Sequence, residues 1–179
     1  MKLRVASHLR TIRRHRKLVR QGCFKVGLYY QGLVHDLSKY SPTEFFVGIK
    51  YFQGDRSPNN AEREDIGYSK SWLHHKGRNK HHYEYWTDYS ATQPDGSIHP
   101  VPMPDKYIVE MCMDRIAASK VYKGKDYDDT CPLKYLEQGK ENKPMHEDTM
   151  NKLEKMLTIL AEKGEDELYR YIKEGFLKK

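Results

Sequence analysis

Apolar residues recur every three or four positions along most of this chain, and this periodicity predicts α-helices. The alternation of apolar and polar residues that is typical of strands is almost absent, so the fold class that we expect is all-α. The predicted helices cover residues 4–20, 24–39, 42–54, 58–77, 106–122 and 147–163, and a last short helix follows residue 164. Within the second of these helices, Val26, Leu33, Val34 and Leu37 are the expected core residues.

Capping residues and glycines mark several helix boundaries. Ser41 is expected to cap a helix that has Pro42 in its first turn and Glu44 three residues after the cap. Gly22 is expected to end the first helix, and Gly77 is expected to end the helix that carries a histidine pair.

Two stretches lack the helical pattern. Residues 88–105 contain four prolines and a glycine and predict a loop, while the polar residues 123–143 predict irregular structure. From this organisation we expect a helical domain over residues 1–143, followed by a helical C-terminal extension over residues 144–179.

Composition narrows the classes of protein to consider. The chain has 179 residues, 37% of them hydrophobic, and a mean hydropathy of −0.92. No apolar run approaches the roughly 18–20 residues of a membrane-spanning helix, and the N-terminus has no apolar signal core, so we expect neither a membrane protein nor an exported one. Three cysteines without paired-motif spacing favour reduced thiols in a cytoplasmic protein. The net charge of +7 favours anionic partners.

The first candidate for chemistry is the His35-Asp36 pair, which interrupts an apolar helical run. A buried carboxylate normally pairs with a cation or binds a metal. The alternative is a helix end where His35 caps carbonyl groups and Asp36 faces water. His15 lies on the apolar stripe of the first helix, as does His8, and either could be a hydrogen-bonded core histidine. Two crossing helices would bring His15 against His35.

A cluster of four histidines follows within residues 74–82, namely His74, His75, His81 and His82. Neutral imidazole is a common ligand for divalent metals, and the basic residues around the cluster suit an anionic substrate bound to the metal. The alternative is a polar surface loop.

Further on, Asp114 shares a helical stripe with Tyr107, Met111, Ala118 and Val121, and we expect it to be the one acid on a buried face. A carboxylate in that position needs a metal or an arginine as its partner.

This order of residues resembles the HD superfamily, a group of all-helical metal-dependent phosphohydrolases. The resemblance implies an HD-domain-like helical bundle in which His15, His35, Asp36 and Asp114 bind one metal ion, with His8 as the alternative to His15. It also implies that intervening histidines, drawn from His75, His81 and His82, bind a second ion in binuclear members. The cofactor would be one or two divalent ions of Mn, Fe, Co, Ni, Zn or Mg.

The chain also resembles a family of uncharacterised bacterial and phage proteins, some of which carry two similar segments. In this sequence they read His-Asp-Leu-Ser-Lys at residues 35–39 and Asn-Lys-His-His-Tyr-Glu-Tyr-Trp at residues 79–86. This second resemblance names no substrate.

The hypothesis that we carry forward is a metal-dependent phosphohydrolase that acts on a nucleotide or another small phosphoester. Asp36 would bind metal and orient the attacking water, and Lys39 would reach a substrate phosphate from one helical turn away. Arg78, Lys80 and Arg115 are further candidates to hold the phosphate.

Two alternatives remain open at this stage. One is a di-iron oxygenase, because some HD-type proteins with four histidines and two aspartates activate oxygen. The other is a non-enzymatic nucleic-acid-binding protein, since the first helix carries a basic face opposite its apolar stripe. That face is formed by Arg10, Arg13, Arg14, Arg16, Lys17 and Arg20. Assembly with a second copy of the chain also stays open.

Overall fold

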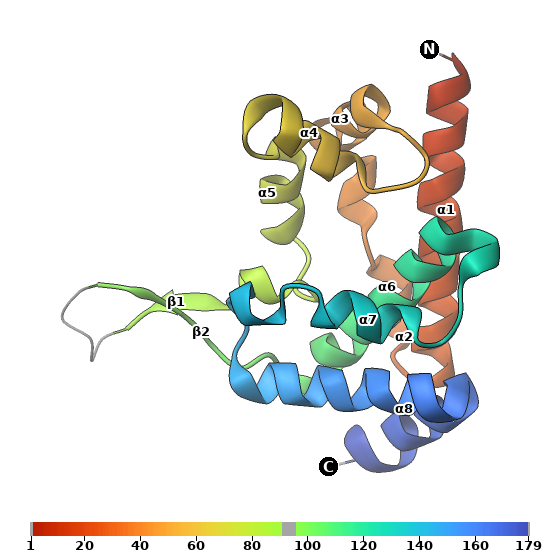
Figure 1. The fold of residues 1–179 in the computed structure, drawn as a ribbon, viewed down its shortest axis with the longest axis vertical. Helices are drawn as coiled ribbons and strands as arrows, with labels where there is room; N and C mark the ends of the chain where they lie inside the picture. Colours follow the sequence, from red (N-terminus) through yellow and green to blue (C-terminus); the bar gives the residue numbers. More distant parts are fainter. Residues whose placement is uncertain (1, 91–95, 179) are drawn as a thin grey trace.

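The structure is a computed structural model that describes residues 2–90 and 96–178, and it is all-α apart from one small hairpin (Figure 1). The α-helices are α1 (Lys2–Lys25), α2 (Tyr29–Val34), α3 (Pro42–Tyr51), α4 (Pro58–Ile66), α5 (Lys70–Lys76), α6 (Asp105–Lys123), α7 (Cys131–Glu137) and α8 (Glu147–Tyr171). Short 3-10 or π segments are η1 (Leu37–Tyr40), η2 (Tyr83–Tyr85), η3 (Gly124–Asp126), η4 (Lys140–Asn142) and η5 (Ile172–Phe176). Within these two ranges, none of the helices combines the length and the hydropathy that a bilayer-crossing segment needs.

Helix α1 is longer than its sequence pattern predicts, because Gly22 does not end it. Gly22 is buried, and a β-carbon added there would lie 2.6 Å from the sulfur of Met113 on α6. The glycine therefore allows α1 and α6 to pack closely at this point. The predicted apolar stripe of α1 does face inward, since Ile12, His15 and Val19 are all buried.

The single helix predicted over residues 24–39 is wrong. The chain instead forms α2 and the short η1 segment, with His35 and Asp36 in the turn between them. Two of the expected core residues point outward as a result, since Leu33 is 55% exposed and Leu37 is 50% exposed. The break turns the polar pair inward and the flanking leucines toward solvent.

The Ser41 cap is confirmed, because its hydroxyl accepts a hydrogen bond from the backbone N–H of Glu44 at the start of α3. The next predicted helix is two helices, α4 and α5. Gly67 ends α4 in a left-handed conformation with φ of 81°, and Ser69 caps α5 through its hydroxyl. This separation gives α5 its own direction (Figure 1), and α5 carries His74 and His75.

Both stretches predicted to be irregular contain some regular structure. Strands β1 (Thr87–Tyr89) and β2 (Ile98–Pro100) form an antiparallel hairpin that projects from the helical body (Figure 1). The predicted loop residue Pro94 lies outside the described residues. Helix α7 occupies part of residues 123–143.

The hydrophobic core lies where α1, α6, α7 and α8 meet. Helix α6 runs through its middle and buries eight residues on several sides, so the single buried stripe predicted for this helix is wrong. Helix α8 adds Leu153, Leu157 and Leu160 to the same core, and Gly164 introduces the predicted irregularity within α8. Side chains from both of the predicted segments therefore share one core, and the boundary at residue 143 stays a prediction.

Candidate metal centre

Asp36, which belongs to both groups of potential metal ligands described below, lies in a strained turn. Its φ of 54° makes it the only non-glycine residue with a positive φ in the part of the chain that the structure describes. Aspartate tolerates this left-handed conformation better than most residues, but strain of this kind persists only where the surroundings impose it. Both Asp36 and His35 are buried to 1% exposure or less. The turn thus places a carboxylate and an imidazole side by side in the interior.

The first group of potential metal ligands joins α1, the Asp36 turn and α6. His15 Nε2 lies 2.9 Å from Asp114 Oδ1, 3.5 Å from Asp36 Oδ2 and 3.4 Å from His35 Nε2. His35 Nε2 lies 3.4 Å from Asp36 Oδ2 and 3.6 Å from Asp114 Oδ1. Ligands arranged tetrahedrally around a divalent ion lie about 3.4 Å apart when each bond is near 2.1 Å. These four atoms fit such an ion.

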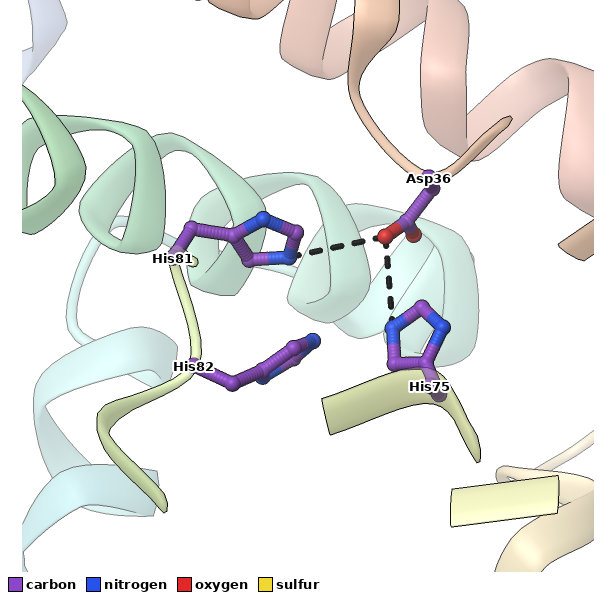
Figure 2. A group of neighbouring side chains, drawn as sticks. All are labelled: Asp36, His75, His81 and His82. Atoms are coloured by element: carbon purple, nitrogen blue, oxygen red, sulfur yellow. Dashed lines mark ion pairs between the residues drawn. The ribbon is translucent and has the colours of Figure 1, made fainter. Parts of the chain in front are cut away.

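The second group brings Asp36 together with His75, His81 and His82, whose rings surround a common point in Figure 2. His75 Nε2 lies 3.3 Å from Asp36 Oδ1, and His81 Nε2 lies 3.5 Å from the same oxygen. The four ligand atoms all lie within 4.8 Å of one another.

Three buried polar atoms of this second group lack a hydrogen-bond partner among the described residues, namely Asp36 Oδ1, His81 Nε2 and His82 Nε2. Buried polar atoms are rarely left without a partner, because desolvation is then uncompensated. A divalent ion between them would satisfy all three, so the residues present fit a metal.

Asp36 belongs to both groups, and it offers a different oxygen to each. Oδ2 faces His15 and His35, whereas Oδ1 faces His75 and His81. Asp36 is therefore common to both groups of potential metal ligands.

Glu110 orients two of the histidines from behind. Its Oε1 accepts hydrogen bonds from Nδ1 of His35 at 2.8 Å and from Nδ1 of His81 at 3.1 Å. These hydrogen bonds hold each Nδ1 toward Glu110 and direct Nε2 of each ring toward the other ligand candidates, where it could bind a metal once it is deprotonated. A third set of potential metal ligands consists of His35, His81 and Glu110. The distances from Glu110 to the two rings, however, are those of ordinary hydrogen bonds. Glu110 is 4% exposed, so the prediction that Asp114 is the one acid on the buried face of α6 is wrong.

Glu44 orients the two histidines of α5, His74 and His75, in the same way. Its two oxygens each lie 2.7 Å from a ring nitrogen, Oε2 from Nδ1 of His75 and Oε1 from Nδ1 of His74. His75 is thereby oriented toward Asp36. His74, which the sequence could not distinguish from its neighbours, turns to Glu44 and belongs to neither ligand group.

The charges of the centre follow from burial and from close partners. Burial raises the pKa of Asp36, but the neighbouring charges of His35 and Lys39 outweigh it and hold that pKa well below its usual range. The pKa of Asp114 is also well below its usual range. Burial raises this pKa, but hydrogen bonds with His15 and His35 lower it by more. Burial lowers the pKa of His82, with the charges of His81 adding to the effect. At neutral pH the carboxylates are ionised and His82 is neutral, the forms in which both bind metal.

Lys39 lies next to the centre, as predicted, although not through a continuous helix. The η1 segment brings its ammonium into contact with Asp36 Oδ2, and its side chain is 32% exposed. Lys39 therefore links a carboxylate of the centre to the surface.

The other residues predicted to bind phosphate form no ion pair with the ligand candidates among the described residues, and their role stays a prediction. Arg78 and Lys80 are exposed, and Lys80 lies over the ring of Tyr85. Arg115 lies near the ring of Tyr135, and its Nε and Nη1 have no hydrogen-bond partner among the described residues. No ion pair within the described ranges joins any of the three basic residues to the centre.

The structure places His15, and not His8, with the other ligand candidates. His8 is buried two turns away, where its ring packs against Phe45 and Phe52. A β-carbon on Gly48 would lie 2.2 Å from His8 Nε2, so the imidazole fills a space that the glycine leaves open.

Sequence reasoning missed both orienting carboxylates. Glu110 lies four residues before Asp114 on one helix, and this spacing was a usable signal that both share a face. Glu44 gave no such signal, because its position three residues after Ser41 is already explained by capping.

Comparison with known protein families places the chain in a family of unknown function. A family model described as "Family of unknown function (DUF5662)" matches residues 4–159, a range that contains every ligand candidate. No curated protein and no solved structure matches the chain.

Proposed function

This chain belongs to DUF5662, a family of unknown function, and we propose that it is a two-metal phosphohydrolase that acts on a small phosphoester. The observation that carries the proposal is the shared carboxylate of Asp36, which faces a different pair of histidines with each oxygen. The order His15, His35-Asp36, His75, His81-His82 and Asp114 also resembles that of binuclear HD-superfamily enzymes.

Each residue has a role that follows from its position. Bound divalent ions would lower the pKa of a coordinated water and polarise a phosphoryl oxygen. Asp36 would help to hold the ions and to orient that water. Glu110 and Glu44 would keep Nε2 of His35, His81 and His75 directed inward.

Lys39 supports a phosphorylated substrate in particular. Its ammonium already contacts a carboxylate of the centre, and its side chain is partly exposed. An entering phosphate could replace Asp36 as the partner of this ammonium and form an ion pair with it. A nucleotide or another small anionic phosphoester fits this arrangement and the net charge of +7.

Elemental analysis of the purified protein tests the centre before a substrate is known. We expect about two divalent ions per chain in the wild type, about one in His15→Ala and in His82→Ala, and almost none in Asp36→Ala. Asp55→Ala is the matched control, because Asp55 is exposed and outside the centre. Circular dichroism verifies that each variant is folded.

Hydrolysis is then measured across a panel of nucleotides and phosphodiesters with Mn, Co, Ni, Mg and Fe. Lys39→Gln should retain metal and lose hydrolysis, whereas Asp36→Ala should lose both. Wild-type protein that holds no metal and cleaves no phosphoester would contradict the proposal. Bound iron with oxygen uptake and no hydrolysis would support the di-iron oxygenase alternative instead.

A further inference from the structure

The positive charge of this protein is concentrated in one helix. Residues 2–25, which form α1, include nine lysines and arginines and no acidic residue. The whole chain has 32 basic and 25 acidic residues, so the remainder holds 23 basic and all 25 acidic ones and has a net charge of −2. The net charge of +7 is therefore a property of α1 rather than of the general surface.

Five of these charges lie on the exposed side of α1 and form no ion pair. Arg10, Arg13, Arg14, Lys17 and Arg20 are all exposed, and none forms an ion pair with any residue in the described ranges. Basic residues on other elements do find acids, as Arg56 does in Glu64 on α4 and Lys140 in Glu154 on α8.

Like charges three and four residues apart on a helix repel each other, so this face is destabilised in the free protein. A bound polyanion would remove that repulsion and gain attraction. Arg10 and Arg20 are separated by about 15 Å along the helix axis. Four exposed cations along this length, namely Arg10, Arg13, Lys17 and Arg20, could each meet one phosphate of a strand.

Exposed aromatic rings border this basic face. Tyr29 is 61% exposed and packs edge-on against Phe24 of α1, with ring centroids 5.3 Å apart. Tyr40 is 39% exposed, and the guanidinium of Arg16 lies 5.2 Å from its ring centroid. Aromatic side chains beside a basic track are the means by which proteins stack the bases of single strands.

The opposite face of α1 is unavailable for a membrane. Its apolar residues Ile12, Val19 and Cys23 are buried in the core, so the helix has no apolar face to insert into lipid. Arginine also predominates over lysine among the exposed cations, and its planar fork suits bidentate binding to phosphate.

We propose that the outer face of α1 is a docking surface for single-stranded nucleic acid, bound through its phosphates along Arg10, Arg13, Lys17 and Arg20. This surface is separate from the metal centre, because His15 points from the inner side of the same helix. The inference goes beyond the proposed function and stands without it.

Binding is measured by fluorescence anisotropy with a labelled oligodeoxythymidylate, a labelled duplex of mixed sequence, and phosphatidylserine vesicles in parallel. We expect the single strand to bind with a slope of log K against log salt of about −3, from roughly four phosphates. Excess chelator should leave this affinity unchanged, which separates the result from any failure of the metal proposal.

Two variants decide whether oligonucleotide binding depends on the face of α1 or on the overall charge of the protein. The test variant carries Arg10→Gln, Arg13→Gln, Lys17→Gln and Arg20→Gln. The matched control removes four exposed charges elsewhere, through Lys70→Gln, Lys125→Gln, Lys134→Gln and Lys173→Gln. We expect the affinity to fall at least about tenfold in the test variant and less than about twofold in the control. Circular dichroism verifies that both are folded.

Four results would overturn the proposal. They are equal losses in the two variants, tighter binding of the duplex than of the single strand, binding of vesicles without binding of oligonucleotides, and no oligonucleotide binding at low salt. Selective loss in the α1 variant, with the single strand preferred, supports it.

Discussion

At the scale of single residues, the candidate centre depends on side chains that do two things at once. Asp36 adopts a strained backbone conformation and offers each of its oxygens to a different set of imidazoles. Glu110 receives hydrogen bonds from His35 and His81, so one carboxylate fixes a ring in each ligand group. Such orienting carboxylates raise the basicity of the ligand and fix its tautomer.

Replacing Glu110 with glutamine should therefore weaken metal binding without removing a ligand. We expect the dissociation constant for Zn²⁺ or Mn²⁺ to rise about tenfold to a hundredfold, measured by competition with a chromogenic chelator. Glu137→Gln is the control, because Glu137 is exposed on α7. An unchanged dissociation constant in Glu110→Gln would mean that this carboxylate has no part in the centre.

At the scale of elements, one helix provides two different environments for histidine. His15 and His8 lie on the same buried stripe of α1, but His15 meets the carboxylates of α6 and the Asp36 turn, whereas His8 meets the aromatic rings around α3. Burial, together with the charge of Lys39, lowers the pKa of His8 to about 4.

The stability of the protein should accordingly fall in acid. Since the pKa of His8 is lower in the folded state than its value of 6.5 in the unfolded chain, the unfolded chain binds the proton first. His8 should thus reduce the unfolding free energy progressively from about pH 6.5 to about pH 4, and no further below that. Urea unfolding of metal-free wild type and His8→Leu measures the difference. Parallel pH profiles for the two proteins would refute the assignment.

At the scale of the whole molecule, the ligand candidates join segments that are far apart in sequence. They come from α1, the Asp36 turn, α5, the segment before η2 and α6. A bound ion would link these segments in the folded state alone, because the unfolded chain does not assemble the site.

Chelation should therefore lower the thermal stability of purified protein. With free metal at about a hundred times its dissociation constant, one site adds about 2.7 kcal/mol, which corresponds to a Tm change of roughly 5–10 °C in a chain of this size. Differential scanning fluorimetry with and without EDTA measures this change. Asp36→Ala should show almost no EDTA-dependent change, while Asp55→Ala should match the wild type. A wild-type Tm that is insensitive to metal and to EDTA would argue against a resident ion.

The all-α class, the inward stripe of α1, the Ser41 cap and the placement of α6 could be predicted from the sequence because each depends on local periodicity or on a few neighbouring residues. The convergence of the histidines and aspartates could be anticipated for a related reason. Polar residues that interrupt an apolar pattern must find partners when the pattern is buried.

Tertiary structure alone decided what those residues contact. The break at Asp36, which turns Leu33 and Leu37 to solvent, follows from packing that no local pattern contains. The partners of Glu44 lie about thirty residues away on α5, so a side chain that looks like a helix cap becomes a support for His75. Local sequence sets which backbone conformations are favourable, whereas contacts between distant segments depend on how the helices pack, and that packing is a property of the whole chain.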